Sequence, residues 1–417
     1  MPTPTQMESL RNAISYDRLP VCSGAVSSPP EALYLYYGKE KPRFVNFGSA
    51  TPEDLDSLVA ACDPATFGRG DEDVYDESYR KAFKMDAANF AVQFDLAASG
   101  LIGTLEDRLL QGDTGNMKIK AELYKLNVYD KDSFFKAHRD TPRGTNMIGS
   151  LMIIYPTPHE GGELVLRHKD HEWKFDAKSL TASQVSPSLA YVAFYSDIEH
   201  EVLKVTSGRR VTITYNLYLE VPAADTRAST IIREVKSISN LQRTLQGLLK
   251  SPEFLPTGAT LGFGLVHLYP VTFNTKLRDL ANYLKGEDAN VYQVCRELRL
   301  QPSVRVIYDD VQRGSRFGIM MEKIVKNPSY HYEEEEGYED RLIEIGGKAV
   351  NKKEGVDLSR IQERSSTNAE LITWVSPFNR RTKLHDVNVT YGNEVSVGYM
   401  YCSPCIIVSI PPAIDRL

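Results

Sequence analysis

Short apolar runs separated by turn-forming residues fill the chain between about residues 120 and 220. Each run is long enough for one strand, and no helix-length amphipathic stretch separates two of them. Many short strands with regular turns are typical of an antiparallel barrel or sandwich, whereas a doubly wound parallel sheet needs strands that alternate with helices. We therefore predict strands over 123–129, 148–155, 164–167, 173–175, 189–195, 202–205 and 211–219.

Two helices are predicted ahead of this β-rich segment. Thr51 can cap a helix, Pro52 suits its first turn, and the two acids that follow favour its positive end. Leucines spaced by four predict the second helix over 101–110. Residues 1–50 mix apolar runs with Pro, Ser and Gly, so we expect an irregular lead-in with one extended piece over 32–37.

The pattern changes again after a break at residues 222–225. Helical stripes over 231–249, 277–284 and 291–298 are interleaved with strand-like runs, which predicts an α+β arrangement. The strand-like runs cover 260–269, 304–308, 317–325, 371–375 and 395–410. We therefore expect two domains, 1–220 and 221–417, the second with an accessory role or a role in covering the substrate.

Composition limits the classes of partner. The 417 residues are 42% hydrophobic and 25% charged, as in globular proteins, with a formal net charge of -6. A duplex-DNA binder usually has a basic surplus, so we expect no nucleic-acid partner. No apolar run approaches the ~20 residues of a membrane span, so no membrane partner is expected either. Five cysteines do not make a disulfide framework, which favours an intracellular, cytoplasmic or nuclear location.

Three residues of the β-rich segment suggest a metal site. His138 and Asp140 are two positions apart, so in an extended chain both side chains emerge on one face. His200, on a later strand, would complete the set. Two histidines and one carboxylate suit non-haem Fe(II), because they leave coordination positions open.

Arg210 suggests the cosubstrate. It opens a strand on which Arg210 and Thr212 share one face. A guanidinium that points into a barrel needs a carboxylate, which it grips with two hydrogen bonds. 2-Oxoglutarate offers a keto-acid end for iron and a distal carboxylate for such an arginine. Arg209 is the alternative carboxylate partner.

These blocks resemble the Fe(II)/2-oxoglutarate-dependent oxygenases, in the prolyl-4-hydroxylase-like branch, with fungal relatives. The resemblance covers about residues 120–220. It implies a mainly β fold: a double-stranded β-helix (jelly-roll) core with N-terminal supporting helices and a C-terminal α+β domain. It also implies iron held by the three residues above and 2-oxoglutarate held by Arg210. The residues that carry it are Tyr129, Phe134-Phe135, His138 to Arg143, Gly161 to Leu164, and His200-Glu201-Val202 running to Gly208-Arg209-Arg210.

Further site residues follow from the same resemblance and from strand alternation. Relatives place a tyrosine facing the cosubstrate where Tyr129 stands. They also carry a tyrosine near residues 154–155 that helps to hold the distal carboxylate, and Thr212 or Ser150 is the alternative for that place. Tyr155 is a further candidate for the distal carboxylate. Lys125 and Asn127 share the strand face of Tyr129. We assign them to the substrate, together with Arg143.

The activity implied is oxidation of a C–H bond, by hydroxylation, with release of succinate and CO2 and with ascorbate as a reductant. The substrate is either a small molecule or peptide, or a prolyl side chain of a protein. A binding or regulatory protein on a jelly-roll scaffold that has lost catalysis is the alternative. A second His-x-Asp at His168-Lys169-Asp170 is a weaker candidate for iron, because its polar surroundings predict a hairpin turn.

Overall fold

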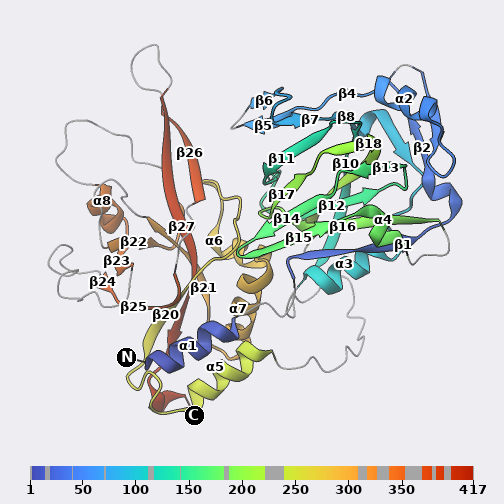
Figure 1. Cartoon of the computed structure of the whole chain (residues 1–417). Helices are drawn as coiled ribbons and strands as arrows, with labels where there is room; N and C mark the ends of the chain where they lie inside the picture. The colour runs from blue at the N-terminus through green and yellow to red at the C-terminus, as the bar shows by residue number, and fades with distance from the viewer. Residues whose placement is uncertain are drawn as a thin grey trace, which may run out of the picture. The chain divides into compact units, whose positions relative to one another are not determined.

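The computed structural model describes most of the chain, in two compact units. The described residues are 2–14, 19–39, 41–69, 72–110, 117–140, 142–182, 187–220, 239–308, 317–325, 338–352, 369–377, 382–388 and 396–416. The first unit, here the central unit, comprises the described parts of 18–110 and 115–224. The second, the terminal unit, comprises those of 1–17 and 225–417. Both are mainly β, with mostly antiparallel sheets (Figure 1).

A seven-stranded antiparallel sheet is the largest element of the central unit (Figure 1). Its long inner pair sets the register that matters for the site, because Tyr129 lies opposite Arg210 and Lys125 lies opposite Thr214. In order across the sheet, the strands are β1 (Val21–Ser27), β16 (Ser188–Tyr195), β12 (Met147–Ile154), β19 (Arg210–Glu220), β10 (Lys118–Tyr129), β8 (Phe83–Asp86) and β4 (Asp63–Pro64).

A five-stranded antiparallel sheet accompanies it. His138 and His200 lie directly opposite each other on two of its neighbouring strands. The order is β15 (His171–Phe175), β14 (Leu164–His168), β17 (Glu199–Val202), β11 (Phe134–His138) and β7 (Arg80–Lys81). Smaller sheets pair β13 (His159–Gly161) with β18 (Val205–Gly208), β5 (Phe67–Arg69) with β6 (Glu72–Val74), and β2 (Tyr34–Tyr37) with β3 (Arg43–Asn46) and β9 (Phe90–Val92).

The predicted strands of this segment are confirmed, with one correction. The expected strand over 202–205 is wrong, because β17 ends at Val202 and β18 begins at Val205. Between them the backbone changes sheets, and the N–H of Val205 donates to the carbonyl of Ser133. Both valines are buried, so their apolar character does not distinguish one strand from two.

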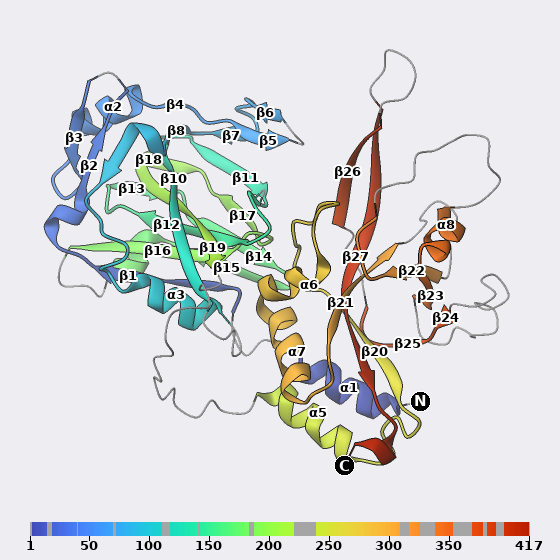
Figure 2. The ribbon, with the colours of Figure 1, turned by 180° about the vertical axis from the view of Figure 1, so that it is seen from behind.

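The two predicted helices of the central unit are also confirmed. Helix α2 (Pro52–Ala60) begins with a capping box in which Thr51 and Asp54 satisfy each other's backbone N–H groups. Helix α3 (Leu101–Leu109) buries its three leucines and packs against β1 and β10 (Figure 2). A short helix, α4 (Ala177–Thr181), lies against β16.

The expected irregular lead-in over residues 1–50 is wrong. Helix α1 (Pro4–Ala13) has a capping box from Thr3 and buries Met7 and Leu10 in the core of the terminal unit. The extended piece expected over 32–37 begins instead with a 3-10 turn, η1 (Pro30–Leu33), before β2. The prediction failed because these elements are short and owe their stability to partners far along the chain.

The terminal unit contains an eight-stranded sheet that mixes antiparallel and parallel pairs. In order, it has β24 (Ala369–Glu370), β23 (Lys348–Asn351), β22 (Phe317–Met321), β21 (Ser303–Tyr308), β27 (Ser396–Ile410), β20 (Ala259–Gly264) and β25 (Ile372–Ser376), while β26 (Thr382–Asn388) pairs with β27. Figure 2 shows three of its helices gathered beside this sheet: α1, α5 (Asn240–Lys250) and α7 (Gly286–Glu297). The others are α6 (Leu277–Leu280), η3 (Ala281–Tyr283), α8 (Tyr338–Glu344) and η4 (Ala413–Asp415).

Several predicted bounds change in this unit. The helix expected over 231–249 is present from 240 onward, and residues 221–238 lie outside the described residues. The strand expected over 260–269 ends at Gly264. The division at residue 220 stays a prediction, although residues 2–14 group with the terminal unit. Among the described residues, no helix combines the length and the apolar character that a membrane span needs.

Candidate active site

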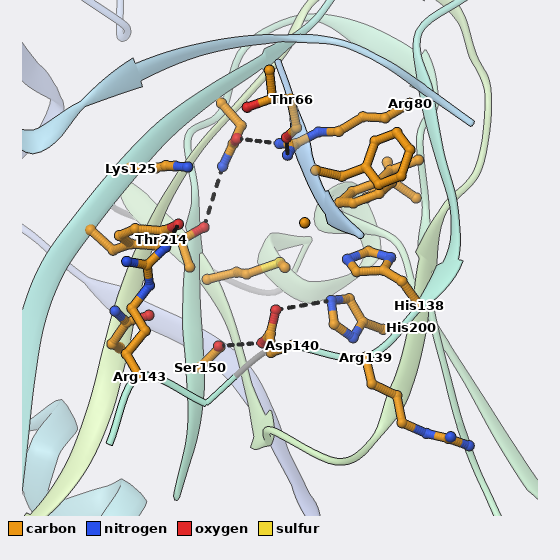
Figure 3. A pocket seen from close by; sticks show the side chains of 18 of the residues that line it. Thr66, Arg80, Lys125, His138, Arg139, Asp140, Arg143, Ser150, His200 and Thr214 are labelled. Atoms are coloured by element: carbon orange, nitrogen blue, oxygen red, sulfur yellow. Dashed lines mark hydrogen bonds and ion pairs between the residues drawn. The ribbon is translucent and has the colours of Figure 1, made fainter. Parts of the chain in front are cut away.

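A cavity of about 340 Å³ lies in the central unit between its two main sheets. Side chains of β10, β12 and β19 form one wall, and side chains of β11 and β17 form the opposite one. The hairpin β5–β6 contributes Phe67, Gly68 and Asp73. Figure 3 shows that the labelled residues around this space come from strands far apart in the sequence.

Three metal-ligating side chains meet at one end of the cavity. Among the described residues, His138, Asp140 and His200 are the group whose ligand atoms all lie within 4.8 Å of one another. His138 ends β11 and His200 lies opposite it on β17, so the pairing of two strands brings the imidazoles together. Asp140 follows two residues after His138, and its Oδ1 lies 3.7 Å from Nε2 of His200. Figure 3 shows all three directed to the same space.

The backbone fixes which nitrogen of each imidazole faces that space. Nδ1 of His138 lies 2.8 Å from the carbonyl oxygen of Lys136, and Nδ1 of His200 lies 3.1 Å from that of Ile198. A carbonyl only accepts hydrogen bonds, so each Nδ1 carries a proton, and Nε2 is the nitrogen that each ring presents to the cavity. Burial lowers the pKa of His138 to about 2, and the neighbouring His200 adds to the effect. Both features suit a metal ligand.

A hydrogen bond also fixes the carboxylate of Asp140. The hydroxyl of Ser150, on β12, donates to Oδ2 of Asp140 at 2.5 Å. This leaves Oδ1 directed to His200 (Figure 3). The expected place of Ser150 beside the cosubstrate stays a prediction.

Arg210 is buried in the central unit and is not among the residues that line the cavity. Its side chain is 2% exposed, and neither Nη1 nor Nη2 has a hydrogen-bond partner. Burial lowers its pKa, and nearby Tyr129, whose ring centre lies 5.6 Å from the guanidinium carbon, opposes that effect. Gly162 makes room for it: a Cβ there would lie 3.0 Å from Cδ of Arg210, and the φ of +73° also favours glycine.

The remaining predicted residues divide into two groups. Lys125, Asn127 and Tyr129 line the cavity from β10, and Arg143 lines it from the loop before β12. Thr212 is buried on the same face of β19 as Arg210 and is not part of the cavity lining. Alternation along the two strands therefore gave the correct facing.

Three alternatives can now be placed. His168 and His171 flank a tight turn, with Lys169 at a φ of 53°, between β14 and β15, as predicted. Arg209 forms an ion pair with the exposed carboxylate of Asp56, outside the cavity. Tyr155 stacks on Phe47, with ring centres 4.3 Å apart, and also lies outside the lining.

Sequence reasoning missed Arg80. This arginine is 8% exposed, lines the cavity from β7 and lies over the ring of Phe135, with 4.3 Å from its guanidinium carbon to the ring centre. It donates to the carbonyl of Thr66 at 2.7 Å and to Oδ1 of Asn127 at 2.8 Å. Strand β7 has two residues, too few for any periodicity to predict its facing.

Comparison with known families agrees with this geometry. Residues 124–218 match the family described as the 2OG-Fe(II) oxygenase superfamily, and this range contains the whole triad and Arg210. The match is confined to this segment, which is less than a quarter of the chain. No curated protein matches the chain.

Solved structures similar to this chain include prolyl hydroxylases. A Pseudomonas putida prolyl-4-hydroxylase is 15% identical over 52% of this chain and 100% of its own, with a TM-score of 0.30. A Trichoplax adhaerens prolyl hydroxylase, in complex with a hypoxia inducible factor peptide fragment, is 19% identical over 39% and 72%, with a TM-score of 0.27. A Phytophthora capsici prolyl 4-hydroxylase is 18% identical over 60% and 81%, with a TM-score of 0.22. Because these TM-scores are low, we base no conclusion about this chain on the structural similarity.

The residues present fit the iron and 2-oxoglutarate that the family implies. Two imidazoles and a carboxylate are a donor set suited to Fe(II). The unpartnered guanidinium of Arg210 has two nitrogen donors without acceptors, which a carboxylate satisfies in a bidentate pair. A buried arginine without any acceptor is costly, so its retention is explained by an anionic ligand.

Proposed function

We propose that the protein is an Fe(II)- and 2-oxoglutarate-dependent oxygenase that hydroxylates a C–H bond of its substrate. The convergence of His138, Asp140 and His200 within 4.8 Å at the cavity supports this proposal. The buried, unpartnered guanidinium of Arg210 supports the choice of cosubstrate. When bound, iron and 2-oxoglutarate supply the oxidising chemistry, with succinate and CO2 as coproducts.

We also infer a double-stranded β-helix core. Eight strands of the central unit divide between the two main sheets in the orders β16-β12-β19-β10 and β15-β14-β17-β11. Chain neighbours such as β10 and β11, or β16 and β17, therefore lie in different sheets, as in a double-sheet jelly roll. In this interpretation, the supporting helices are α2 and α3, and the terminal unit is an accessory domain.

The chain's own residues have separable roles in this proposal. Nε2 of His138, Nε2 of His200 and a carboxylate oxygen of Asp140 hold the iron, while Ser150 orients that carboxylate. Arg210 holds the distal carboxylate of 2-oxoglutarate, with Tyr129 and Thr212 beside it. Burial of His200 and Arg210 keeps water from these two side chains, which strengthens their electrostatic contacts.

The substrate enters the remaining space of the cavity, where Lys125, Asn127 and Arg143 are its proposed contacts. A volume of about 340 Å³ is at the small end of ligand sites, so it holds a small molecule or one side chain rather than a folded segment. A prolyl side chain of a protein and a small molecule or peptide both remain proposals. Ascorbate as reductant and an intracellular location also stay predictions.

Succinate formation tests the proposal. The purified full chain with Fe(II) and 2-oxoglutarate should form succinate even without added substrate, at a slow uncoupled rate, and His138→Ala should abolish this. Lys120→Met is a matched control, because Lys120 is an exposed residue of β10 that pairs with Glu122 and Glu220 outside the cavity. Equal succinate from the native protein and His138→Ala would reject the oxygenase and favour a binding protein on this scaffold.

A further inference from the structure

The cavity carries more positive charge than iron and cosubstrate binding require. Besides the proposed ligand Asp140, its acidic lining residue is Asp73, whereas Arg80, Lys125 and Arg143 contribute three cations. A fourth, Arg139, points away from the cavity in Figure 3 and pairs with Glu199 at 3.7 Å. Fe(II), the charge of Asp140, a 2-oxoglutarate dianion and Arg210 sum to zero, so those three cations are not balanced by the proposed catalytic groups.

Arg80 gives the clearest sign that this charge has a ligand. Its guanidinium is more than nine-tenths buried, and its Nε has no hydrogen-bond partner. Its two contacts, with Thr66 and Asn127, are to neutral oxygens. Neutral acceptors satisfy the geometry of a guanidinium but do not neutralise its charge, and a buried unpaired charge is costly.

Lys125 and Arg143 gather around the ring of Tyr124. The ammonium of Lys125 lies 4.7 Å from the ring centre, and the guanidinium carbon of Arg143 lies 4.5 Å from it. Arg143 also donates to the hydroxyl of Tyr124 at 2.6 Å. Among the described residues, no carboxylate forms an ion pair with Arg80, Lys125 or Arg143. The aromatic ring holds these two cations in place without neutralising them.

Lys125 is separate from the proposed cosubstrate position. In the β10–β19 register, Arg210 lies opposite Tyr129 and Lys125 lies opposite Thr214, four residues along the strand. At about 3.4 Å per residue, this separates the two backbone positions by roughly 14 Å. A five-carbon diacid that spans from Arg210 to the metal therefore leaves the Lys125 end of the cavity free.

We propose that the substrate presents a carboxylate to Arg80, Lys125 and Arg143 in this cavity. This inference rests on the proposed function and names the substrate class of the same cavity. The carboxylate anchors the substrate, and its C–H bond then lies over the triad. It belongs either to a free small acid or to an acidic side chain of a peptide.

Binding of matched acids and amides tests this, without relying on turnover. The full chain is loaded with Mn(II) in place of Fe(II) and with saturating 2-oxoglutarate, so that the Arg210 end is filled. Ac-Ala-Glu-Ala-NH2 is compared with Ac-Ala-Gln-Ala-NH2, and N-acetylalanine with its amide. Affinity is read from the shift of the thermal unfolding midpoint with ligand concentration. At least one acid should bind about tenfold more tightly than its amide, or more tightly still. A difference in the tripeptide pair would assign the carboxylate to an acidic side chain of a peptide, and a difference in the N-acetylalanine pair would assign it to a free small acid.

Variants decide whether the cavity causes the preference. Lys125→Met combined with Arg143→Met removes two of the three cations, so the acid-to-amide ratio should fall well below that of the native protein. Lys120→Met removes a lysine from the same strand outside the cavity, so its ratio should equal that of the native protein. Lys125→Glu keeps a charged side chain at this half-buried position and should favour Ac-Ala-Lys-Ala-NH2 over the acidic peptide.

Two results would overturn the inference: equal binding of acid and amide by the native protein, or an acid-to-amide ratio in the double variant and in Lys125→Glu that equals the native ratio. The proposed function fails in a different way. In that case 2-oxoglutarate would not raise the unfolding midpoint of the Mn(II)-loaded protein at all. A protein that responds to 2-oxoglutarate but does not distinguish acids from amides would refute only the substrate class.

Discussion

Two buried arginines of the central unit differ in the hydrogen bonds that their guanidinium groups make with the protein. Arg210, at the start of β19, has no hydrogen-bond partner for either terminal nitrogen. Arg80, on β7, donates to a backbone carbonyl and to an amide oxygen. The protein's own contacts hold Arg80 in place, whereas Arg210 lacks any polar contact of that kind. Arg80 therefore also supports the structure of the protein, whereas the terminal nitrogens of Arg210 find an acceptor only when a ligand is bound.

Replacing Arg210 should have the largest effect. Arg210→Met should weaken 2-oxoglutarate binding to the metal-loaded protein about 100-fold or more, because a buried charge pair is lost. The same change should stabilise the ligand-free protein by about 1 kcal/mol or more, since it removes an unpaired buried cation. Calorimetric titration and urea unfolding measure the two effects. An unchanged affinity would show that another group holds the cosubstrate.

Arg80→Met should have the opposite effect on stability. It leaves the Thr66 carbonyl and the Asn127 amide oxygen without a donor, so the free energy of unfolding should fall by about 1–3 kcal/mol. Affinity for 2-oxoglutarate should fall far less than in Arg210→Met. Urea unfolding of both variants, side by side, checks the difference in sign. Two variants that change stability in the same direction would remove the distinction drawn above.

Ser150→Ala tests the support of the carboxylate. Without the hydroxyl, Asp140 loses its 2.5 Å contact, and metal affinity should fall about tenfold. Titration with Mn(II) measures this. Met152→Leu, two residues along the same strand face, is the matched control and should keep native affinity. Native affinity in Ser150→Ala would mean that the backbone alone positions Asp140.

Arg209→Ala should have the smallest effect. Its partner Asp56 is largely exposed, and such ion pairs contribute about 0–1 kcal/mol. Stability should therefore change by less than about 1 kcal/mol, and 2-oxoglutarate affinity should match that of the native protein. Because Arg209 and Arg210 are adjacent, this variant also tests strand facing. A large loss of cosubstrate affinity would assign the carboxylate to Arg209.

The sequence was most informative where the relevant pattern is local. Alternation over Arg210 and Thr212, and over Lys125 and Asn127, depends on neighbouring residues, and the structure places these side chains on the expected face. The convergence of His138, Asp140 and His200 also followed from strand order. The catalytic roles of these residues stay predictions.

Other features could not be predicted from local patterns. Arg80 lies on a two-residue strand that exists only because it pairs with β11. The contact of Ser150 with Asp140 depends on the path of the segment between β11 and β12. The alternation of side chains along a strand does not predict that path. Helix α1 has ten residues, too few to be stable alone, and its burial depends on α5.

The packing of α1 on α5 has a consequence for biosynthesis. The first helix leaves the ribosome roughly 230 residues before its partner. At about 5–20 residues per second, Met7 and Leu10 stay without their final neighbours for roughly 10–45 s. The whole of the central unit is translated in this interval. We therefore expect the terminal unit to complete its fold late and to depend more on chaperones than the unit that carries the triad.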